Sequence, residues 1–254
     1  MAGISDFGMT AAGQRVQAIT LRNGALTACI LTYGAILQGL RLEGVGHGLT
    51  LGSESLADYE GAMRFHGALI APVANRLRDG RAPIDGGEHQ IVSTDGHPHA
   101  LHSGPAGAHL KNWTLEETGP ASVTLALRLP DGEGGFPGNR DLGAVFSLPG
   151  GDRLRMEVTA RTDRPTLFNA ANHSYWNLDG SANWQGHRLR IAAGHYLPAD
   201  ADVLPTGEIA PVAGSDFDFR AGRVAGPENP ALDHNFCLSN AREALRPVLD
   251  LTGA

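Results

Sequence analysis

The sequence predicts an all-β fold, a large antiparallel β-sandwich. Apolar and polar residues alternate with a period of two in several short segments, turn-forming residues separate these segments, and helical periodicity is weak. Glycine contributes 34 and proline 15 of the 254 residues, well above the roughly 12% of average proteins. Hydrophobic residues at 42% and charged residues at 19% are typical of a globular chain and exclude a disordered one.

The strand signals are clearest in residues 123–129, 153–159 and 188–191. Apolar residues occupy every second position there, with mostly polar residues between them. Such a strand places one side in a core and the other in water. Nearer the N-terminus, Asn23-Gly24 separates residues 18–22 from 25–31, and Asn-Gly favours a two-residue hairpin turn. Helical periodicity is limited to short stretches, which predict helices around residues 53–59 and 241–245.

The chain carries no linker, low-complexity run or internal repeat, so we expect a single domain over residues 1–254. A formal charge of −7 without a basic tract argues against nucleic-acid binding. We also expect no signal peptide and no membrane span, because no apolar run is long enough. Cys29 and Cys237 are too few for a disulfide framework. These observations predict a cytoplasmic protein, and its oligomeric state is not readable from them.

Nucleotide-binding and nucleophile motifs are absent from the sequence. Residues 44–48 contain three glycines but do not match G-x-G-x-x-G, and neither a P-loop nor a G-x-S-x-G elbow occurs. His97, His99 and His102 form the densest histidine cluster. Two of them are two residues apart, which is compatible with a metal-dependent β-barrel enzyme, but Pro98 interrupts the strand. Loop histidines are the simpler interpretation of His97 and His99.

His102 and His173 stand in a different kind of segment. His102 ends an apolar run at a glycine loop, and His173 belongs to the polar and aromatic run Asn172-His-Ser-Tyr-Trp-Asn-Leu178. Such groups within an apolar strand need partners. They fit either a hydrogen-bonded network in the core or a sugar site, because aromatic faces and Asn or His donors suit a sugar ring.

Arg76 and Asp233 each stand next to an apolar run. Arg76 follows residues 68–73, where it can cap a strand end or present several donors to a polyhydroxyl ligand. Asp233 precedes residues 236–238, where its carboxylate can accept hydroxyl hydrogens or close a turn. Both alternatives remain open on these residues alone.

Together, these segments resemble the aldose 1-epimerase (galactose mutarotase) family. The matching segments follow the family order, lie within residues 32–236, and are Asn75-Arg76, residues 100–104, 131–138, 172–178, 204–208 with 216–219, and 232–236. The resemblance implies the galactose mutarotase-like supersandwich and an isomerase that interconverts the anomers of free hexoses. The implied partner is a small aldose of the glucose or galactose class, and no metal or redox cofactor is implied.

The resemblance also implies roles for individual residues. His173 matches the family's general acid at the ring oxygen, and His102 assists at the same sugar. Asn75, Arg76 and Asp233 match the residues that bind hydroxyls, and Tyr175 adjoins the acid and is expected to line the pocket. Histidine suits this chemistry because its pKa of about 6.5 lets it give and retrieve a proton near neutral pH.

One feature of the family pattern has no match. The family's general base is a glutamate near the C-terminus, well downstream of the Asp-His-Asn motif, and Glu243, the last glutamate here, matches no family motif. We therefore expect either a C-terminally incomplete chain or a chain without the base. The second case corresponds to an alternative function, a non-catalytic sugar-binding or regulatory module. Glu208 and Glu243 are the first candidates if the base lies within residues 1–254.

Overall fold

The computed structural model describes residues 3–93, 96–227 and 230–253. Contacts along the chain group it into two compact units, Met1–Trp176 and Asn177–Ala254, which are described separately. Every strand ladder among the described residues is antiparallel, which confirms the predicted all-β class. The expectation of a single domain stays a prediction.

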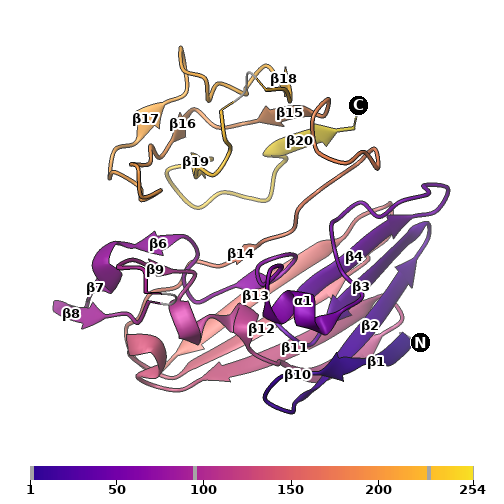
Figure 1. Cartoon of the computed structure of the whole chain (residues 1–254), viewed down its shortest axis with the longest axis horizontal. Helices are drawn as coiled ribbons and strands as arrows, with labels where there is room; N and C mark the ends of the chain where they lie inside the picture. The colour runs from indigo at the N-terminus through magenta and orange to yellow at the C-terminus, as the bar shows by residue number, and fades with distance from the viewer. Residues whose placement is uncertain (1–2, 94–95, 228–229, 254) are drawn as a thin grey trace. The chain divides into compact units, whose positions relative to one another are not determined.

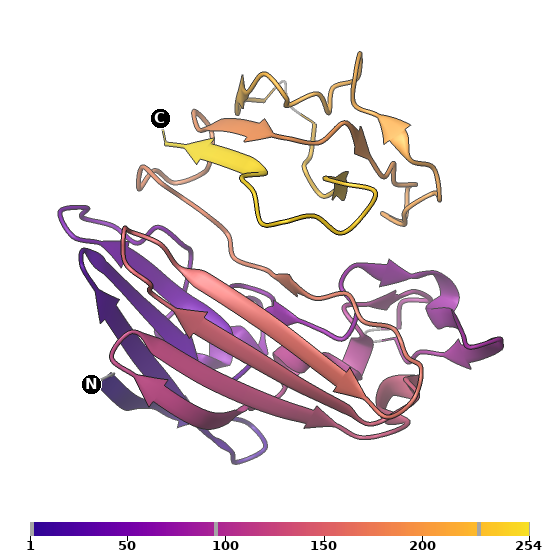
Figure 2. The same cartoon turned by 180° about the vertical axis from the view of Figure 1, so that it is seen from behind.

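Two four-stranded sheets form the body of the first unit (Figures 1 and 2). The first contains, in spatial and sequence order, β1 (Gly3–Met9), β2 (Arg15–Asn23), β3 (Leu26–Leu31) and β4 (Ile36–Leu42). The second contains β10 (Thr114–Gly119), β11 (Ser122–Leu129), β12 (Arg140–Ser147) and β13 (Arg155–Thr162). Each is a meander, because strands that follow one another in sequence pair side by side.

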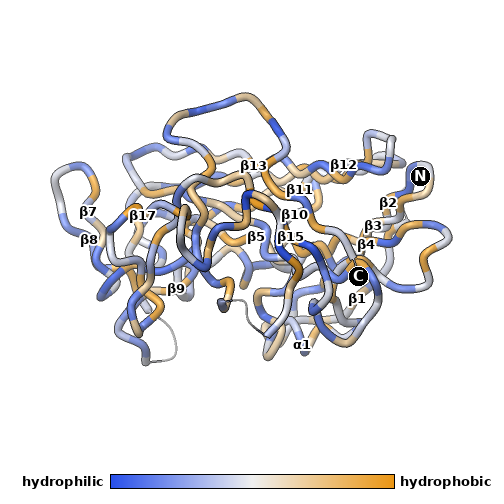
Figure 3. Tube along the Cα trace, turned by 90° about the horizontal axis from the view of Figure 1, so that it is seen from above, coloured by the Kyte–Doolittle hydropathy of each residue, from blue (hydrophilic) through white to orange (hydrophobic). Residues whose placement is uncertain are grey.

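The two sheets share one apolar core and so form a sandwich. Leu21 and Ile30 from the first sheet and Leu125 and Phe146 from the second belong to one buried cluster, together with Trp113. Hydrophobic and hydrophilic residues are mixed along the strands (Figure 3), as the period of two requires. Among the described residues, no helix is long and apolar enough to cross a membrane.

The predicted N-terminal hairpin is confirmed in β2 and β3. Asn23 pairs with Leu26, so Gly24 and Ala25 form the loop, one residue further along than Asn-Gly predicts. Gly24 has φ +59°, a conformation that glycine adopts without steric cost. The resulting turn lets both strands place their apolar residues in the core.

Short elements occupy the remainder of the first unit. The predicted helix near residues 53–59 is present as α1 (Leu56–Glu60). The short strands are β5 (Leu69–Ile70), β6 (Arg76–Leu77), β7 (Arg81–Ile84), β8 (Gly87–Gln90), β9 (Ala100–Leu101) and β14 (Ala171–Asn172). Among them β5 pairs with β14, β6 with β9, and β7 with β8. The pair of β7 and β8 is a tight hairpin, whereas the β5–β14 and β6–β9 pairs join segments that are distant in sequence.

The second unit contains two three-stranded sheets. One has the order β18 (Arg223–Val224), β15 (Arg188–Ile191), β20 (Leu249–Thr252), and the other β17 (Ala210–Pro211), β16 (His195–Tyr196), β19 (Phe236–Cys237). The alternation predicted for residues 188–191 is confirmed, because Leu189 and Ile191 are buried with Phe219.

The helix predicted at residues 241–245 is wrong, since this segment is irregular. The Arg246 side chain donates hydrogen bonds to the Leu238 carbonyl oxygen and to Glu243. Pro247 also disfavours a helical conformation at Arg246. Five residues are too few to offset the cost of helix nucleation without packing against a core.

Candidate active site

The pairing of β6 with β9 positions Asn75 and His102. Arg76 pairs with Leu101 in this ladder, and the residues just outside it, Asn75 and His102, have φ of +62° and +51°. The main-chain N–H of His102 donates to the Asn75 carbonyl oxygen at 2.9 Å. In return the Asn75 N–H donates to Nδ1 of His102 at 3.1 Å. Since Nδ1 accepts, the neutral imidazole carries its proton on Nε2.

The pairing of β5 with β14 positions His173. Beyond this ladder the His173 N–H donates to the Ala68 carbonyl oxygen at 2.9 Å, and the Gly67 N–H donates to the His173 carbonyl oxygen at 3.1 Å. Gly67 has φ +69°, and a Cβ there would lie 2.2 Å from the carbonyl oxygen of Leu37. Only glycine fits this close approach, so Gly67 allows the main chain to hold His173 against residues 67–68.

These two pairings bring three predicted site residues together. The ring centroids of His102 and His173 are 5.3 Å apart and the ring planes meet at 84°. The Tyr175 ring lies 5.3 Å from that of His173 at 39°. Tyr175 is 41% exposed, so the cluster reaches the surface of the first unit.

Three further aromatic side chains belong to this cluster, and the sequence did not indicate them. Phe65 lies 4.9 Å from His102, centroid to centroid, and 5.7 Å from His173. His66 stacks on Tyr175 at 4.3 Å and 25°. His109 lies 5.2 Å from Phe65 and is 2% exposed. Phe65 and His66 occur in a turn-rich segment without periodicity, so no sequence signal could have selected them.

Burial is the main influence on the protonation of these imidazoles. The pKa of His102 is lowered to about 4, mainly by burial and in smaller part by His173, Arg76 and Arg64. Burial likewise lowers the pKa of His109 to about 3, with His102 and Arg64 as secondary causes. The pKa of His66 is lowered by burial and by His173. His66, His102 and His109 are therefore neutral at pH 7.

Arg76 and Asp233 belong to different units. Arg76 is half-buried on β6, and its N–H donates to Oδ1 of Asn75 at 2.7 Å. Asp233 is an exposed residue of the second unit, shortly before β19. Its neighbour His234 packs against Phe217 with ring centroids 4.4 Å apart.

The histidines considered for a metal site have other contacts. Nδ1 of His99 accepts the Asp79 N–H at 3.0 Å, Nδ1 of His102 accepts the Asn75 N–H, and His97 is exposed. Within residues 3–93, 96–227 and 230–253, no group of three or more His, Cys, Asp or Glu side chains could hold a metal ion.

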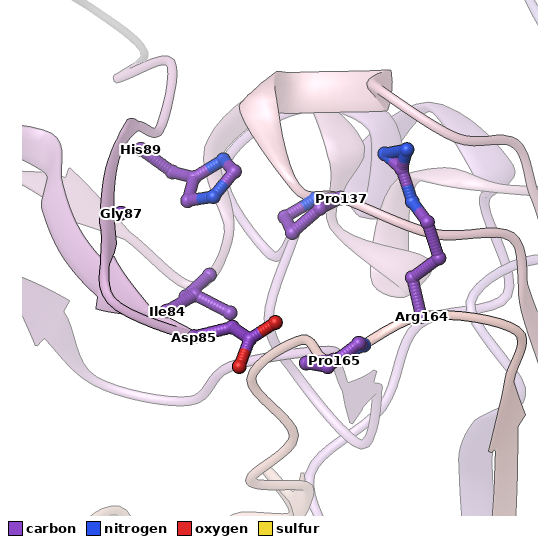
Figure 4. Close-up of a pocket in the computed structure, with 7 residues that line it drawn as sticks. All are labelled: Ile84, Asp85, Gly87, His89, Pro137, Arg164 and Pro165. Carbon is purple, nitrogen blue, oxygen red and sulfur yellow. The ribbon is translucent and has the colours of Figure 1, made fainter.

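A cavity of about 290 Å³ lies elsewhere in the first unit (Figure 4). It is lined by Ile84, Asp85, Gly87, His89, Pro137, Arg164 and Pro165. In Figure 4 the side chains of Asp85 and His89 face Pro137 across the hollow. Its lining contains no residue for which the sequence predicts a role in the site.

Comparison with known proteins gives concordant matches. The sequence profile of the family described as Aldose 1-epimerase matches residues 17–252. The chain is 34% identical over 241 residues to a galactose mutarotase of Rattus norvegicus, covering 91% of this chain and 70% of that protein. It is 34% identical over 221 residues to an aldose 1-epimerase of Escherichia coli, covering 85% of this chain and 64% of that protein.

Two solved structures are similar in fold. A galactose 1-epimerase from Lactobacillus acidophilus has a TM-score of 0.86 and 28% identity, over 100% of this chain and 77% of that one. An aldose epimerase homologue from C. elegans has a TM-score of 0.84 and 29% identity, over 92% of this chain and 74% of that one. These similarities confirm the galactose mutarotase-like β-sandwich expected from the sequence.

Proposed function

The chain belongs to the aldose 1-epimerase family, and we propose that it interconverts the α and β anomers of free aldoses of the glucose and galactose class. Relatives named galactose mutarotase and aldose 1-epimerase, each 34% identical to this chain, support an isomerase. The observation that carries the proposal is the edge-to-face pair of His102 and His173, with ring centroids 5.3 Å apart. Anomer exchange opens the ring by proton transfer, and two imidazoles at one place are suited to it.

His173 is the proposed general acid. When the ring opens, the bond between the anomeric carbon and the ring oxygen breaks, and the ring oxygen must gain a proton. The His173 main chain is fixed by hydrogen bonds on both its N–H and its carbonyl oxygen, whereas its imidazole contacts Phe65, His102 and Tyr175 through their rings. The fixed main chain holds the imidazole beside His102 and Tyr175, which supports this role.

His102 is proposed to assist as a neutral hydrogen-bond donor. Its Nδ1 accepts the Asn75 N–H at 3.1 Å, and its pKa of about 4 keeps it uncharged at pH 7. Its remaining ring nitrogen, Nε2, carries a proton that can be donated to a sugar oxygen. A neutral His102 also avoids repelling the protonated form of His173 that the acid role requires.

Sugar hydroxyls are proposed to bind Asn75, Arg76 and Asp233. The guanidinium of Arg76 supplies donors and the carboxylate of Asp233 supplies acceptors, and sugar hydroxyls need both. Tyr175, 41% exposed beside His173, offers an aromatic face to the sugar. Ring opening also requires a base at the anomeric hydroxyl, for which Glu208 and Glu243 are the first carboxylates of this chain to test.

Polarimetry with α-glucose and α-galactose tests the function directly. We expect the chain to accelerate mutarotation above the spontaneous rate at pH 7, and His173→Asn to remove most of the acceleration. Calorimetric titration of the same sugars is the companion measurement. Sugar binding without acceleration would favour the non-catalytic module over the enzyme.

We also propose a cytoplasmic location. Cys29 and Cys237 are both free thiols, and burial raises the pKa of Cys29 to about 11, so this thiol is unreactive at neutral pH. Free thiols fit a reducing compartment. Fractionation of the source cells, followed by detection of the protein in each fraction, tests the location.

A further inference from the structure

Phe65 contacts three imidazoles of the cluster, although it has no titratable group itself. Its ring centroid is 4.9 Å from that of His102, 5.7 Å from that of His173 and 5.2 Å from that of His109. The ring planes meet those of His102 at 76° and of His173 at 26°. One benzene ring therefore packs against both imidazoles of the proposed proton-transfer pair.

We propose that Phe65 is a positioning residue whose ring sets the edge-to-face arrangement of His102 and His173 and keeps water from both imidazoles. The inference rests on the proposed function, since it concerns the same two histidines. The torsion of an imidazole about its second side-chain bond is broad unless neighbours restrict it. His173 is fixed by its main chain, so the ring contacts of Phe65 and Tyr175 hold its imidazole plane.

Buried groups beside Phe65 indicate a dry environment. His109 is 2% exposed, and its Nδ1 has no hydrogen-bond partner among the described residues. A Cβ on Gly107 would lie 2.3 Å from Cε1 of His109, so the imidazole packs tightly against this glycine. The ring centroids of His102 and His109 lie 4.9 and 5.2 Å from that of Phe65 and 6.4 Å from each other. The Phe65 ring therefore covers part of both imidazoles and keeps water from that part.

Several charged and titratable groups influence the pKa values of the histidines around Phe65. His173, Arg76 and Arg64 lower the pKa of His102, and His102 in turn lowers the pKa of His109. The Arg64 guanidinium carbon lies 4.9 Å from the Phe65 ring centroid, so Phe65 also holds a positive charge close to the cluster. His173 contributes to the lowered pKa of His66. Removing the Phe65 ring would admit water, which stabilises a protonated His102 against these positive charges.

The test compares Phe65→Leu with Phe65→Tyr, which keeps the ring, and with Phe7→Leu as a matched control. Phe7 is a half-buried member of the same apolar cluster as Phe65, and its ring contacts Tyr59. In the whole 254-residue chain, NMR titration of the histidine ring protons gives the pKa of His102. Thermal unfolding reports stability, and polarimetry gives kcat and KM.

We expect Phe65→Leu to raise the pKa of His102 by about one pH unit or more. The same variant should lower kcat about 10- to 100-fold, because displaced reacting groups lose rate steeply, with KM changed less than about twofold. Phe65→Tyr, which keeps the ring, should leave the pKa of His102 and kcat near their wild-type values. Phe7→Leu should lower the melting temperature while leaving the pKa and kcat at wild-type values.

A Phe65→Leu variant with the wild-type His102 pKa and kcat overturns the proposal. So does a Phe7→Leu variant that changes both by as much. If Phe65→Leu does not fold, Phe65→Met, which removes the ring but leaves a flexible apolar side chain that adapts to the space, is judged by the same criteria. A wild-type chain without mutarotation would contradict the proposed function, while the NMR titration would still decide the role of Phe65.

Discussion

The main-chain N–H of Asn75 donates to Nδ1 of His102 at 3.1 Å, and the N–H of His102 donates to the carbonyl oxygen of Asn75 at 2.9 Å. This reciprocal pair fixes which ring nitrogen of His102 carries the proton. It also places the side chain of Asn75 beside a proposed catalytic histidine. Both residues have a positive φ, so the arrangement depends on backbone conformations that most residues disfavour.

Replacement of Asn75 separates its backbone role from its side-chain role. Asn75→Gly keeps the left-handed conformation, φ +62°, and should fold normally. It should weaken sugar binding by about 1–3 kcal/mol, because a sugar hydroxyl loses its partner. Asn75→Val should in addition lose roughly 1–3 kcal/mol of stability to backbone strain. Calorimetry and urea unfolding measure the two effects, and unchanged affinity in Asn75→Gly would exclude a binding role for the side chain.

Replacement of His173 tests the general acid. His173→Asn should lower the mutarotation rate about 10²- to 10⁴-fold with little change in melting temperature, because main-chain hydrogen bonds hold this segment. Polarimetry and thermal unfolding provide the two readouts. His97→Asn, at an exposed histidine, is the control and should retain full activity. A His173 variant with the wild-type rate would remove this residue from the mechanism.

Replacement of Arg76 or Asp233 tests hydroxyl recognition. Arg76→Gln and Asp233→Asn should each weaken sugar binding by about 1–3 kcal/mol, since a sugar hydroxyl is left unsatisfied. The matched controls are Arg128→Gln and Asp141→Asn, an exposed ion pair with 3.7 Å between charged atoms, and these should bind normally. Calorimetric titration gives the affinities. Wild-type affinity in both Arg76→Gln and Asp233→Asn would make these residues structural.

A methyl group at Gly67 should disrupt the segment that holds His173. Gly67→Ala places a Cβ 2.2 Å from the Leu37 carbonyl oxygen at φ +69°, and we expect a loss of about 2–4 kcal/mol in unfolding free energy. Gly44→Ala is the control, because φ is +83° but no atom lies within 4 Å. It should lose only about 1–2 kcal/mol, the cost of the conformation. Equal losses in urea unfolding would contradict the close approach at Gly67.

Acid should destabilise the fold through the buried histidines. The pKa of His102 is about 4 and that of His109 about 3, both below the unfolded value of about 6.5. As the pH falls below 6.5, the unfolded chain therefore binds protons that the folded chain does not. The unfolding free energy should decrease by about 1.4 kcal/mol per pH unit for each histidine, until the pH reaches its folded pKa.

Urea unfolding between pH 7 and pH 4 measures this slope. His109→Gln removes one titrating group and should flatten the slope by about 1.4 kcal/mol per pH unit. Comparison with the wild type cancels the contribution of carboxylates. An identical slope in the two proteins would show that His109 is not a buried neutral histidine.

Local patterns were sufficient to predict much of the fold. The alternation in residues 123–129 and 188–191 predicted β11 and β15, because the period of a strand depends only on its own residues. The prediction of a helix at residues 241–245 was wrong. A pattern of five residues contains no information about contacts with other segments, such as the hydrogen bond from Arg246 to the Leu238 carbonyl oxygen.

The sequence by itself determined the sandwich class, the family resemblance, and a set of polar residues in apolar segments that includes His102 and His173. Only the tertiary structure decided how these residues meet. The β6–β9 and β5–β14 pairs join distant segments and set the 5.3 Å separation of the two imidazole rings. The part that Phe65, His66 and His109 have in the cluster could be identified only from the tertiary structure. The physical reason is that a side chain's neighbours, its burial and therefore its pKa depend on which distant strands pair, and no local pattern encodes that.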